Sequence, residues 1–400
     1  MEKQNGKYIS TFRQFAILSP KEFEKYLSAR KNSPYTETFD FSIHGEQSFL
    51  FLDPSLTNLL VDLAEKDGTL NAELNALPLE AKQAFYRHSL CEEILATNSL
   101  ENIHSTQKEV QDALLEAKSS SNSKVISIAK GYDSLLSENK PSFPTSNEEV
   151  RQIYDSVILQ SIEKENYPDG KLYRAKGVSI TDGVKEYHKP PYGEATLQAN
   201  IATALSICQK KSIPVFIRAA IFHFIYEYTH PFYDGNGRLG RYLLSLFFLT
   251  EGKLSSCFCL SPAISRKKAR YYKAFEETED VRNHGDLSTF VYPFLSLLKE
   301  GIDHNLAYIE ESKAKMASLQ SQIEKNGSLS SRDKEVLIVL IPPSVFSFNG
   351  YSSTELAVKL GKGKATIDRA LSSLSRAGLL KKEKISKSIY YSLNEDAFRL

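Results

Sequence analysis

The order of apolar and polar residues along the 400-residue chain predicts a protein built mainly from helices. Residues 214–229 are apolar nearly all round, which predicts a buried helix. Pro54 stands before apolar residues at helical spacing and marks a helix start. A narrower apolar stripe over residues 302–324 predicts a polar connecting helix. Helices therefore dominate the pattern, with a few extended pieces before residue 85.

Two segments break this helical pattern. Residues 171–197 alternate polar and apolar positions around Asp182-Gly183 and end in a Pro-Pro pair, which predicts a β-hairpin. Because a lone hairpin buries little surface, we expect a ligand or partner to use it. From residue 331 onward the order is helix, glycine turn, helix and two short strands, which predicts a separate C-terminal unit.

Charge and composition narrow the class of protein. A net charge of +1 argues against general binding of nucleic acid by the whole molecule. Cys257 and Cys259 have no second pair near them, so reduced structural thiols are favoured over a zinc site. The N-terminus lacks the apolar core of a signal peptide, and the apolar runs flanking residues 230–241 are too short for a bilayer. A soluble cytoplasmic protein without a membrane partner is expected.

The segment HPFYDGNGRLGR, residues 230–241, stands between two very apolar stretches. Pro231 ends the preceding helix because it has no N–H, and the glycines permit a tight loop. A second helix is expected to begin near 236–238, and its N-terminus is suited to an anion. Arg238 and Arg241 lie three residues apart on one face, where two guanidinium groups can bind phosphate oxygens.

Three further side chains of this segment add chemistry. Asp234 supplies a hard oxygen ligand for Mg²⁺, and His230 can take up a proton near neutral pH. Phe232 is expected to point into the core and hold the loop. The segment thus predicts a site that binds a polyphosphate with its metal and places a base beside it. The alternative is a surface loop with ordinary ion pairs.

The whole string resembles the signature of the Fic family, HPFx(D/E)GNGRxxR, at all nine specified positions. The resemblance implies a mainly α fold, the Fic helical bundle with a β-hairpin flap. It also implies transfer of AMP from ATP to a Ser, Thr or Tyr hydroxyl of a protein, self-modification included. By the family's roles, His230 would be the general base and Asp234 would hold Mg²⁺. The ATP-binding residues would be Gly235, Asn236, Gly237, Arg238, Leu239, Gly240 and Arg241, with Arg241 on the γ-phosphate.

The resemblance extends to two segments that flank the nucleotide. The hairpin at 182–191 resembles the family's flap, which adds a strand to the target segment. The stretch YY…NHGD resembles the segment that lies on the adenine side of the nucleotide in the family. A core tyrosine and a capping asparagine are the alternatives there. The additional ATP-contact candidates are Lys185, Glu186, Tyr187, His188, Tyr272 and Asn283. His223 is assigned to packing or to a hydrogen bond, because a helix interior gives it little access.

Residues 97–102, TNSLEN, resemble the inhibitory (S/T)xxxE(G/N) helix that precedes many Fic cores. Thr97, Glu101 and Asn102 match this pattern. The resemblance implies that Glu101 pairs with Arg241 and occupies the group that should hold the γ-phosphate. ATP would then bind without its α-phosphate in line for attack. A solvated helix end is the alternative.

The last 70 residues resemble a winged helix at the level of the fold. Residues 351–392 carry nine Lys or Arg and three Asp or Glu, a net +6. Residues 362–378 would be the recognition helix and 381–393 the wing, with DNA as partner. A protein-interaction wing is the alternative. The predicted domains are an N-terminal region with the inhibitory helix (1–110), the Fic catalytic core (111–300), a linker helix (301–330) and the winged helix (331–400).

Two classes of function are compatible with these patterns. The first is a protein adenylyltransferase, autoinhibited by Glu101, that uses ATP and Mg²⁺. The second is a DNA-binding transcriptional regulator whose Fic core senses a nucleotide or is an inactive remnant. The intact histidine, acid and arginines argue against a remnant, and the retained GNGR argues against a different transfer such as phosphorylation. Removal of AMP by the same site stays open, as do the target protein and the oligomeric state, a homodimer included.

Overall fold

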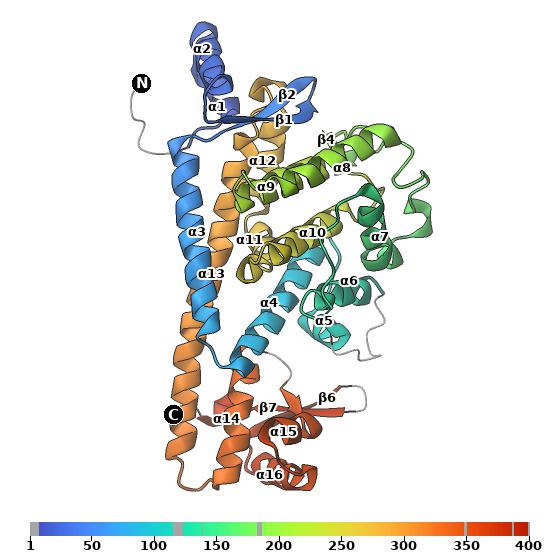
Figure 1. Cartoon of the computed structure of the whole chain (residues 1–400). Coiled ribbons are helices and arrows are strands. Elements are labelled where there is room, and N and C mark those ends of the chain that lie inside the picture. Colours follow the sequence, from blue (N-terminus) through green and yellow to red (C-terminus); the bar gives the residue numbers. More distant parts are fainter. Residues whose placement is uncertain are drawn as a thin grey trace.

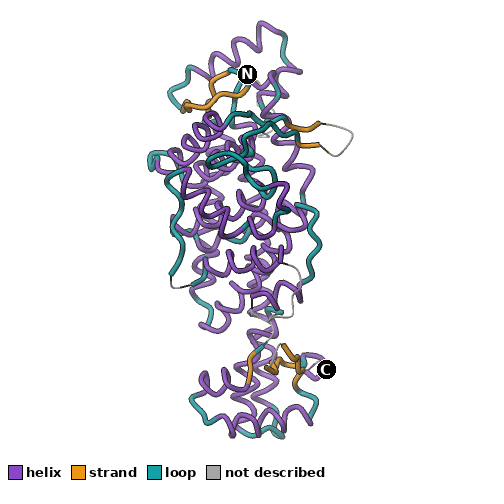
Figure 2. Tube along the Cα trace, turned by 90° about the vertical axis from the view of Figure 1, so that its right-hand side faces the viewer, coloured by secondary structure: helices purple, strands orange, loops and turns teal. Residues whose placement is uncertain are grey.

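Helices form most of the computed structural model, which describes residues 8–114, 123–137, 139–181, 186–347, 350–385 and 388–398. An elongated helical body carries the N-terminal helices and strands at one end and the C-terminal unit at the other (Figures 1 and 2). The fold is mainly α with small sheets, as predicted. Within the described ranges, no helix combines the length and the apolarity that crossing a membrane requires.

The N-terminal region pairs two helices with a β-ribbon. Helices α1 (Thr11–Ile17) and α2 (Pro20–Lys31) precede the antiparallel strands β1 (Thr36–Ile43) and β2 (Glu46–Phe51). The connecting residues His44 and Gly45 both have positive φ, 51° and 83°, as a two-residue hairpin with the usual strand twist requires. Alternate residues of β1 are buried, so one face of the ribbon packs on the helical body.

Two long helices, α3 (Pro54–Asn75) and α13 (Ser288–Lys325), run side by side along the body (Figure 1). Helix α3 begins at Pro54 as predicted, after Asp53, whose side chain accepts the N–H of Leu56. Helix α13 begins at Ser288, so the linker helix expected from 301 is only its later part. Its first turn, residues 288–291, is fully buried and has no polar face. A stripe appears in the sequence only where one side of the helix reaches solvent.

The helices between these two make one continuous core that extends from the β-ribbon to α13 and takes in Phe346. Every residue of α9 from Phe216 to Tyr226 is buried, as its apolar sequence predicted. All four cysteines are buried free thiols. The bounds are α4 (Leu79–Leu100), α5 (Gln107–Leu114), α6 (Ser123–Ser134), α7 (Asn147–Val157), β3 (Ile180–Thr181), β4 (Glu186–His188), α8 (Glu194–Gln209), α9 (Val215–Thr229), α10 (Asn236–Thr250), α11 (Leu260–Arg266) and α12 (Lys268–Glu279).

The C-terminal unit has its own apolar core, which also includes Leu319 and Ile323 of α13. Phe346 packs against the body: its ring centroid lies 6.0 Å from that of Phe85 on α4 and 5.7 Å from that of Tyr308 on α13. Its three strands pair antiparallel in the order β5-β7-β6. The elements are α14 (Ser331–Val345), β5 (Tyr351–Ser352), α15 (Ser353–Leu360), α16 (Lys364–Arg376), β6 (Leu380–Ile385) and β7 (Ser388–Leu393).

Candidate active site

The segment 230–241 forms the connection between the two central helices α9 and α10. Its first residue, His230, closes α9 in the left-handed conformation (φ 47°, ψ 62°) and donates its N–H to the carbonyl of Tyr226 at 2.9 Å. Pro231 then prevents the helix from continuing. Gly235 is left-handed as well (φ 82°), and α10 begins directly after it at Asn236. The loop therefore contains two left-handed residues, His230 and Gly235, within six positions.

The loop is held from inside by Phe232 and Asn236. The Phe232 ring is fully buried, as predicted, and stacks on Tyr154 with centroids 3.7 Å apart and planes 5° from parallel. The Asn236 amide accepts the N–H of Phe232 at 2.9 Å and donates to its carbonyl at 2.8 Å. Both ends of that amide are thus engaged by the loop backbone. What Asn236 can offer a ligand is its main-chain N–H.

The N-terminus of α10 has the features of an anion site. The N–H groups of its first turn have no acceptor within the helix, and the helix dipole is positive there. Arg238 is buried, donates from Nη1 to Ser161 Oγ at 2.7 Å, and lies 3.4 Å from Asp234 Oδ1 through Nη2. Its Nε is buried with no hydrogen-bond partner within the described part of the chain. This N–H is therefore available to an acceptor, such as a water or a ligand oxygen.

Asp234 is the residue that would hold a divalent cation. Its side chain is 40% exposed, and its Oδ1 lies 3.4 Å from Arg238 Nη2. No cluster of three or more His, Cys, Asp or Glu that could hold a metal by itself occurs among the described residues. Mg²⁺ is commonly held by one or two carboxylates together with phosphate oxygens of a nucleotide. A single half-exposed carboxylate beside the N-terminus of α10 fits that mode of binding.

His230 is poised as a neutral imidazole. The pKa of His230 is lowered to about 4, mainly by burial; Glu101 opposes this shift, and His188 and Arg174 add smaller lowering effects. The ring is therefore uncharged at neutral pH and can accept a proton. A base with so low a pKa in the free enzyme is a weak one.

Arg241 contacts two residues of the segment 97–102. Its Nη2 lies 2.6 Å from Glu101 Oε1, and its Nε donates to Thr97 Oγ1 at 2.7 Å. Glu101 caps the C-terminus of α4, and Asn102 follows with positive φ (55°). A Cβ at Gly237 would overlap Glu101 Oε1, so the glycine leaves the space that the carboxylate occupies. The two side chains, 140 residues apart in sequence, form an ion pair at the N-terminal turns of α10.

The electrostatics of this pair favour the charged forms of both partners. Burial would raise the pKa of Glu101, but Arg241, together with Arg238 and His230, lowers it overall. Burial would lower the pKa of Arg241, but Glu101, together with Tyr271 and Glu227, raises it overall. The side chain of Arg241 is 3% exposed and that of Glu101 28% exposed. The arginine is therefore enclosed, whereas the glutamate can be reached from solvent.

Sequence reasoning missed a second carboxyl group beside Arg241. Burial raises the pKa of Glu227 to about 8, with Arg241 lowering it and Glu101 raising it. Its Oε1 is buried without a hydrogen-bond partner in the described ranges, in the space left by Gly240. The signal was present in the sequence, because Glu227 is a charged residue in an apolar helix three positions before His230.

The predicted hairpin is present as strands β3 and β4. Ile180 pairs with His188 and Thr181 with Glu186 in an antiparallel register. Lys185 lies outside the described residues, while Glu186 and Tyr187 belong to β4. The His188 ring is held at the stem: Nδ1 lies 2.5 Å from Glu279 Oε2, and Nε2 lies 2.8 Å from the Tyr228 carbonyl oxygen.

The two candidates for the adenine side differ in their surroundings. Tyr272 on α12 is 43% exposed, and Glu101 is the second contributor, after burial, to its raised pKa. Tyr272 is thus near the Glu101–Arg241 pair and open to solvent. Asn283 is buried, and its amide donates to two backbone carbonyls and accepts from Thr289 Oγ1. Asn283 has the contacts of the capping alternative, and an adenine contact by either residue stays a prediction.

His223 has the internal role expected of it. It is fully buried, and its Nε2 lies 2.7 Å from the hydroxyl oxygen of Tyr271.

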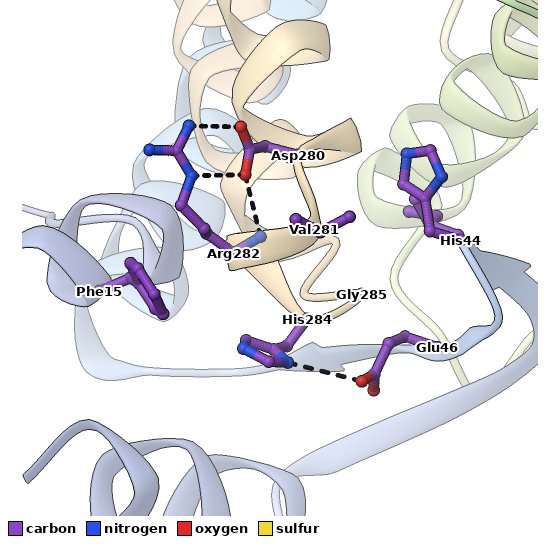
Figure 3. Close-up of a pocket in the computed structure, with 9 residues that line it drawn as sticks. Phe15, His44, Glu46, Asp280, Val281, Arg282, His284 and Gly285 are labelled. Carbon is purple, nitrogen blue, oxygen red and sulfur yellow. Dashed lines mark hydrogen bonds and ion pairs between the residues drawn. The ribbon is translucent and has the colours of Figure 1, made fainter. Parts of the chain in front are cut away.

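The pocket drawn in Figure 3 lies away from the 230–241 loop. It has a volume of about 350 Å³ and is bounded by α1, the turn of the β-ribbon and the segment 280–285. Its charged groups engage one another: Asp280 binds Arg282 in a two-pronged pair, and His284 Nδ1 lies 3.5 Å from Glu46. No residue of segment 230–241 lines it, and we do not assign it to the reaction.

The fold and site together define a class: a helical protein that presents the N-terminus of a buried helix and two buried arginines beside a neutral histidine. Comparison with known proteins agrees. Residues 144–248 match the model of the Fic/DOC family, so this part of the chain forms a Fic domain. The match begins near α7 and ends within α10, so the segment with Glu101 lies outside it.

Two similar proteins extend the comparison. A probable protein adenylyltransferase of Aquifex aeolicus (strain VF5) is 32% identical over 143 residues, which are 36% of this chain and 41% of that protein. The alignment thus spans less than half the length of that relative. A Fic family protein of Desulfovibrio desulfuricans G20 has a similar crystal structure, with a TM-score of 0.55 and 18% identity. The similarity covers 86% of this chain and 97% of that one, and it shows a shared fold.

Proposed function

We propose that the protein transfers AMP from ATP to a hydroxyl group of a protein side chain. The observation that carries this proposal is the neutral, partly buried His230 beside the N-terminus of α10, with Arg238 and Arg241 on that helix. These groups supply a base and a polyphosphate site within one loop. The name of the Aquifex relative points to the same reaction.

The reaction divides into roles that these residues can fill. His230 would take the proton of the attacking hydroxyl, whose oxygen forms a bond to the α-phosphorus as the bond to pyrophosphate breaks. The first-turn N–H groups of α10 and the free Nε of Arg238 would hold the α- and β-phosphates. Mg²⁺ held by Asp234 would neutralise phosphate charge. Arg241 would bind the γ-phosphate once Glu101 has left it.

The conformation described here fits an inhibited state of such an enzyme. Arg241 donates to both Glu101 and Thr97, so its guanidinium is occupied before any nucleotide arrives. A γ-phosphate would have to displace a carboxylate of the same sign from that arginine. We propose that Glu101 in this position keeps ATP from its productive pose.

The reaction type is tested by incubating the full chain with ATP labelled at either the α- or the γ-phosphate. We expect covalent protein label from the α-position only, in the wild type weakly and in Glu101→Gly strongly. Label from the γ-position would indicate phosphorylation and contradict the proposal. Label from neither position, in both proteins and with added acceptor proteins, would favour a nucleotide sensor.

A second function, binding of duplex DNA, is favoured by the exposed face of α16. Arg369 and Arg376 are exposed there together with Ser372 and Ser373, at positions one and two helical turns apart. Lys381, Lys382 and Lys384 are exposed on the neighbouring strand β6. A helix with arginines and small polar residues on its free face suits phosphate and base contacts in the major groove. A protein partner is the alternative occupant.

The DNA prediction is best measured on the full chain, because the C-terminal core includes residues of α13. In fluorescence anisotropy, we expect affinity for duplex DNA to fall steeply as salt rises. Arg369→Ala with Arg376→Ala should flatten the salt slope by about 0.9 per lost phosphate contact. Lys21→Ala with Lys25→Ala, two exposed cations of α2, is the charge-matched control. No binding at low salt would favour a protein partner.

A further inference from the structure

Arg174 is a buried arginine that the reaction described above does not use. It lies in the segment between α7 and β3, and its relative exposure is 0%. None of the ion pairs of the described residues involves it. Burial lowers the pKa of Arg174 from its ordinary, very high value. A buried guanidinium is costly unless its donors are satisfied, so its contacts indicate what holds it there.

Those contacts are carbonyl oxygens of three separate segments. Arg174 Nε donates to the His230 carbonyl at 2.8 Å, and Nη2 donates to the Pro191 carbonyl at 2.6 Å and more weakly to that of Thr229 at 3.3 Å. Nη1 donates to the Lys176 carbonyl at 2.7 Å. In addition, the main-chain N–H of Arg174 donates to the Pro231 carbonyl at 3.0 Å.

The chemistry of this cluster favours arginine over any other side chain. The planar guanidinium presents five N–H donors in a fixed fork, whereas a lysine has one compact ammonium group. Two of the acceptors, the carbonyls of Thr229 and His230, lie at the C-terminus of α9, where the helix dipole is negative. The positive charge is therefore stabilised by backbone oxygens and by the end of the helix that carries His230.

The consequence is a rigid link between the hairpin stem and the histidine. His230 is a non-glycine residue in the left-handed region, which costs free energy unless the surroundings hold it. Arg174 holds the carbonyl of that residue and the main chain on either side of it. The same guanidinium holds Pro191, just beyond β4. Any shift of the hairpin stem is thereby coupled to the orientation of the His230 main chain.

We propose that Arg174 is a positioning residue for the proposed AMP transfer: it sets the imidazole of His230 relative to the hairpin that would present the target hydroxyl. The inference rests on the proposed function and deepens it. A base displaced by about 1 Å can lose about 10²-fold in rate even when the substrates still bind. Arg174 itself need not touch ATP or the target.

A second buried arginine, on the helix α9 that His230 closes, serves as the control that separates a positioning role from a merely structural one. Arg218, at the N-terminal end of α9, is also buried and also donates to backbone carbonyls, from Nε to Ile213 at 3.0 Å and from Nη1 to Cys208. Its Nη2 binds Glu251 at 2.6 Å. It lies three turns from His230. Replacing Arg218 should lower the melting temperature without disturbing the site.

The experiment compares Arg174→Lys and Arg174→Met with Arg218→Lys and Arg218→Met, all in the Glu101→Gly background. We expect Arg174→Met to lose about 10²-fold in kcat for AMP transfer and Arg174→Lys to lose less. Their ATP dissociation constants should stay within about threefold, and Arg174→Lys should recover only part of the rate. The Arg218 variants should keep kcat. Equal loss of kcat in the Arg174 and Arg218 variants at matched loss of melting temperature would overturn the proposal.

A second readout does not depend on activity. Histidine side-chain NMR over a pH series, with the His230 signal identified by its loss in His230→Gln, reports the environment of the ring. We expect the His230 pKa to move from about 4 toward its ordinary value in Arg174→Lys, which keeps the positive charge, and in Arg174→Met. An unchanged His230 titration in Arg174→Lys would overturn the positioning role, because loss of the charge alone would shift the titration in Arg174→Met. If no variant transfers AMP, the proposed function fails, and this titration still decides the role of Arg174.

Discussion

Replacing His230 with alanine is expected to lower the rate of AMP transfer by about 10²–10⁴-fold, the usual cost of losing a general base. ATP binding should change little, because the nucleotide would be held by the first-turn N–H groups of α10, Arg238 and Arg241. The variant is best made in the Glu101→Gly background, where inhibition cannot mask the loss. The measurement is α-label transfer to protein, alongside ATP affinity from calorimetry.

His304→Ala is the matched control for this loss. His304 is an exposed histidine of α13, so its removal should leave both transfer and ATP affinity unchanged. Transfer at the parent rate in His230→Ala would contradict the role of His230 as base. A parallel fall in ATP affinity would instead indicate that the loop has lost its shape.

Replacing Glu101 with glycine is expected to raise self-modification and to tighten ATP binding. The change frees Arg241, whose Nη2 now lies 2.6 Å from Glu101 Oε1. A hydrogen bond to a charged group contributes about 1.5–3 kcal/mol, which corresponds to roughly 10- to 100-fold in affinity. Because the Glu101 side chain is 28% exposed, the lower end of that range is expected. Rate of label transfer and ATP affinity are both measured.

Two further variants make this test specific. Glu101→Gly combined with Arg241→Ala should return to low activity, because the freed arginine is the source of the gain. Ser99→Gly changes an exposed residue of the same helix end and controls for loosening of α4 by glycine. If Glu101→Gly leaves activity unchanged while His230→Ala abolishes it, then residues 97–102 are only a helix end. Activation by Ser99→Gly alone would point to mobility of α4 rather than to the carboxylate.

The local structure of the loop could be predicted well because its determinants are contiguous. Pro231 lacks an N–H and Gly235 tolerates positive φ, so the end of α9 and the start of α10 follow from residues next to one another. The apolar neighbours of the loop likewise predicted a buried α9. The start of α13 was missed by contrast, because its first turn is buried and has no polar face to mark where the helix begins.

The contacts of Arg174, Glu227 and Arg238 required the tertiary structure. The acceptors of Arg174 lie up to 57 residues away in sequence, at the Pro231 carbonyl. No pattern of residue spacing predicts a backbone oxygen as a partner. Glu227 is visible in the sequence as a charge in an apolar helix, but its unpaired oxygen beside Gly240 is not. Nothing in the sequence marks Ser161, whose Oγ accepts a hydrogen bond from Arg238 Nη1 at 2.7 Å.

The sequence by itself determined which residues form the loop, which helices enclose it and which chemical groups it carries, because local backbone preferences and apolar periodicity act over a few residues. The tertiary structure alone decided that burial lowers the pKa of His230 to about 4 and that Arg241 is occupied by Glu101 from a helix 140 residues earlier. Desolvation and ion pairing depend on what surrounds a group in space, and those neighbours come from segments that the chain brings together only when it folds.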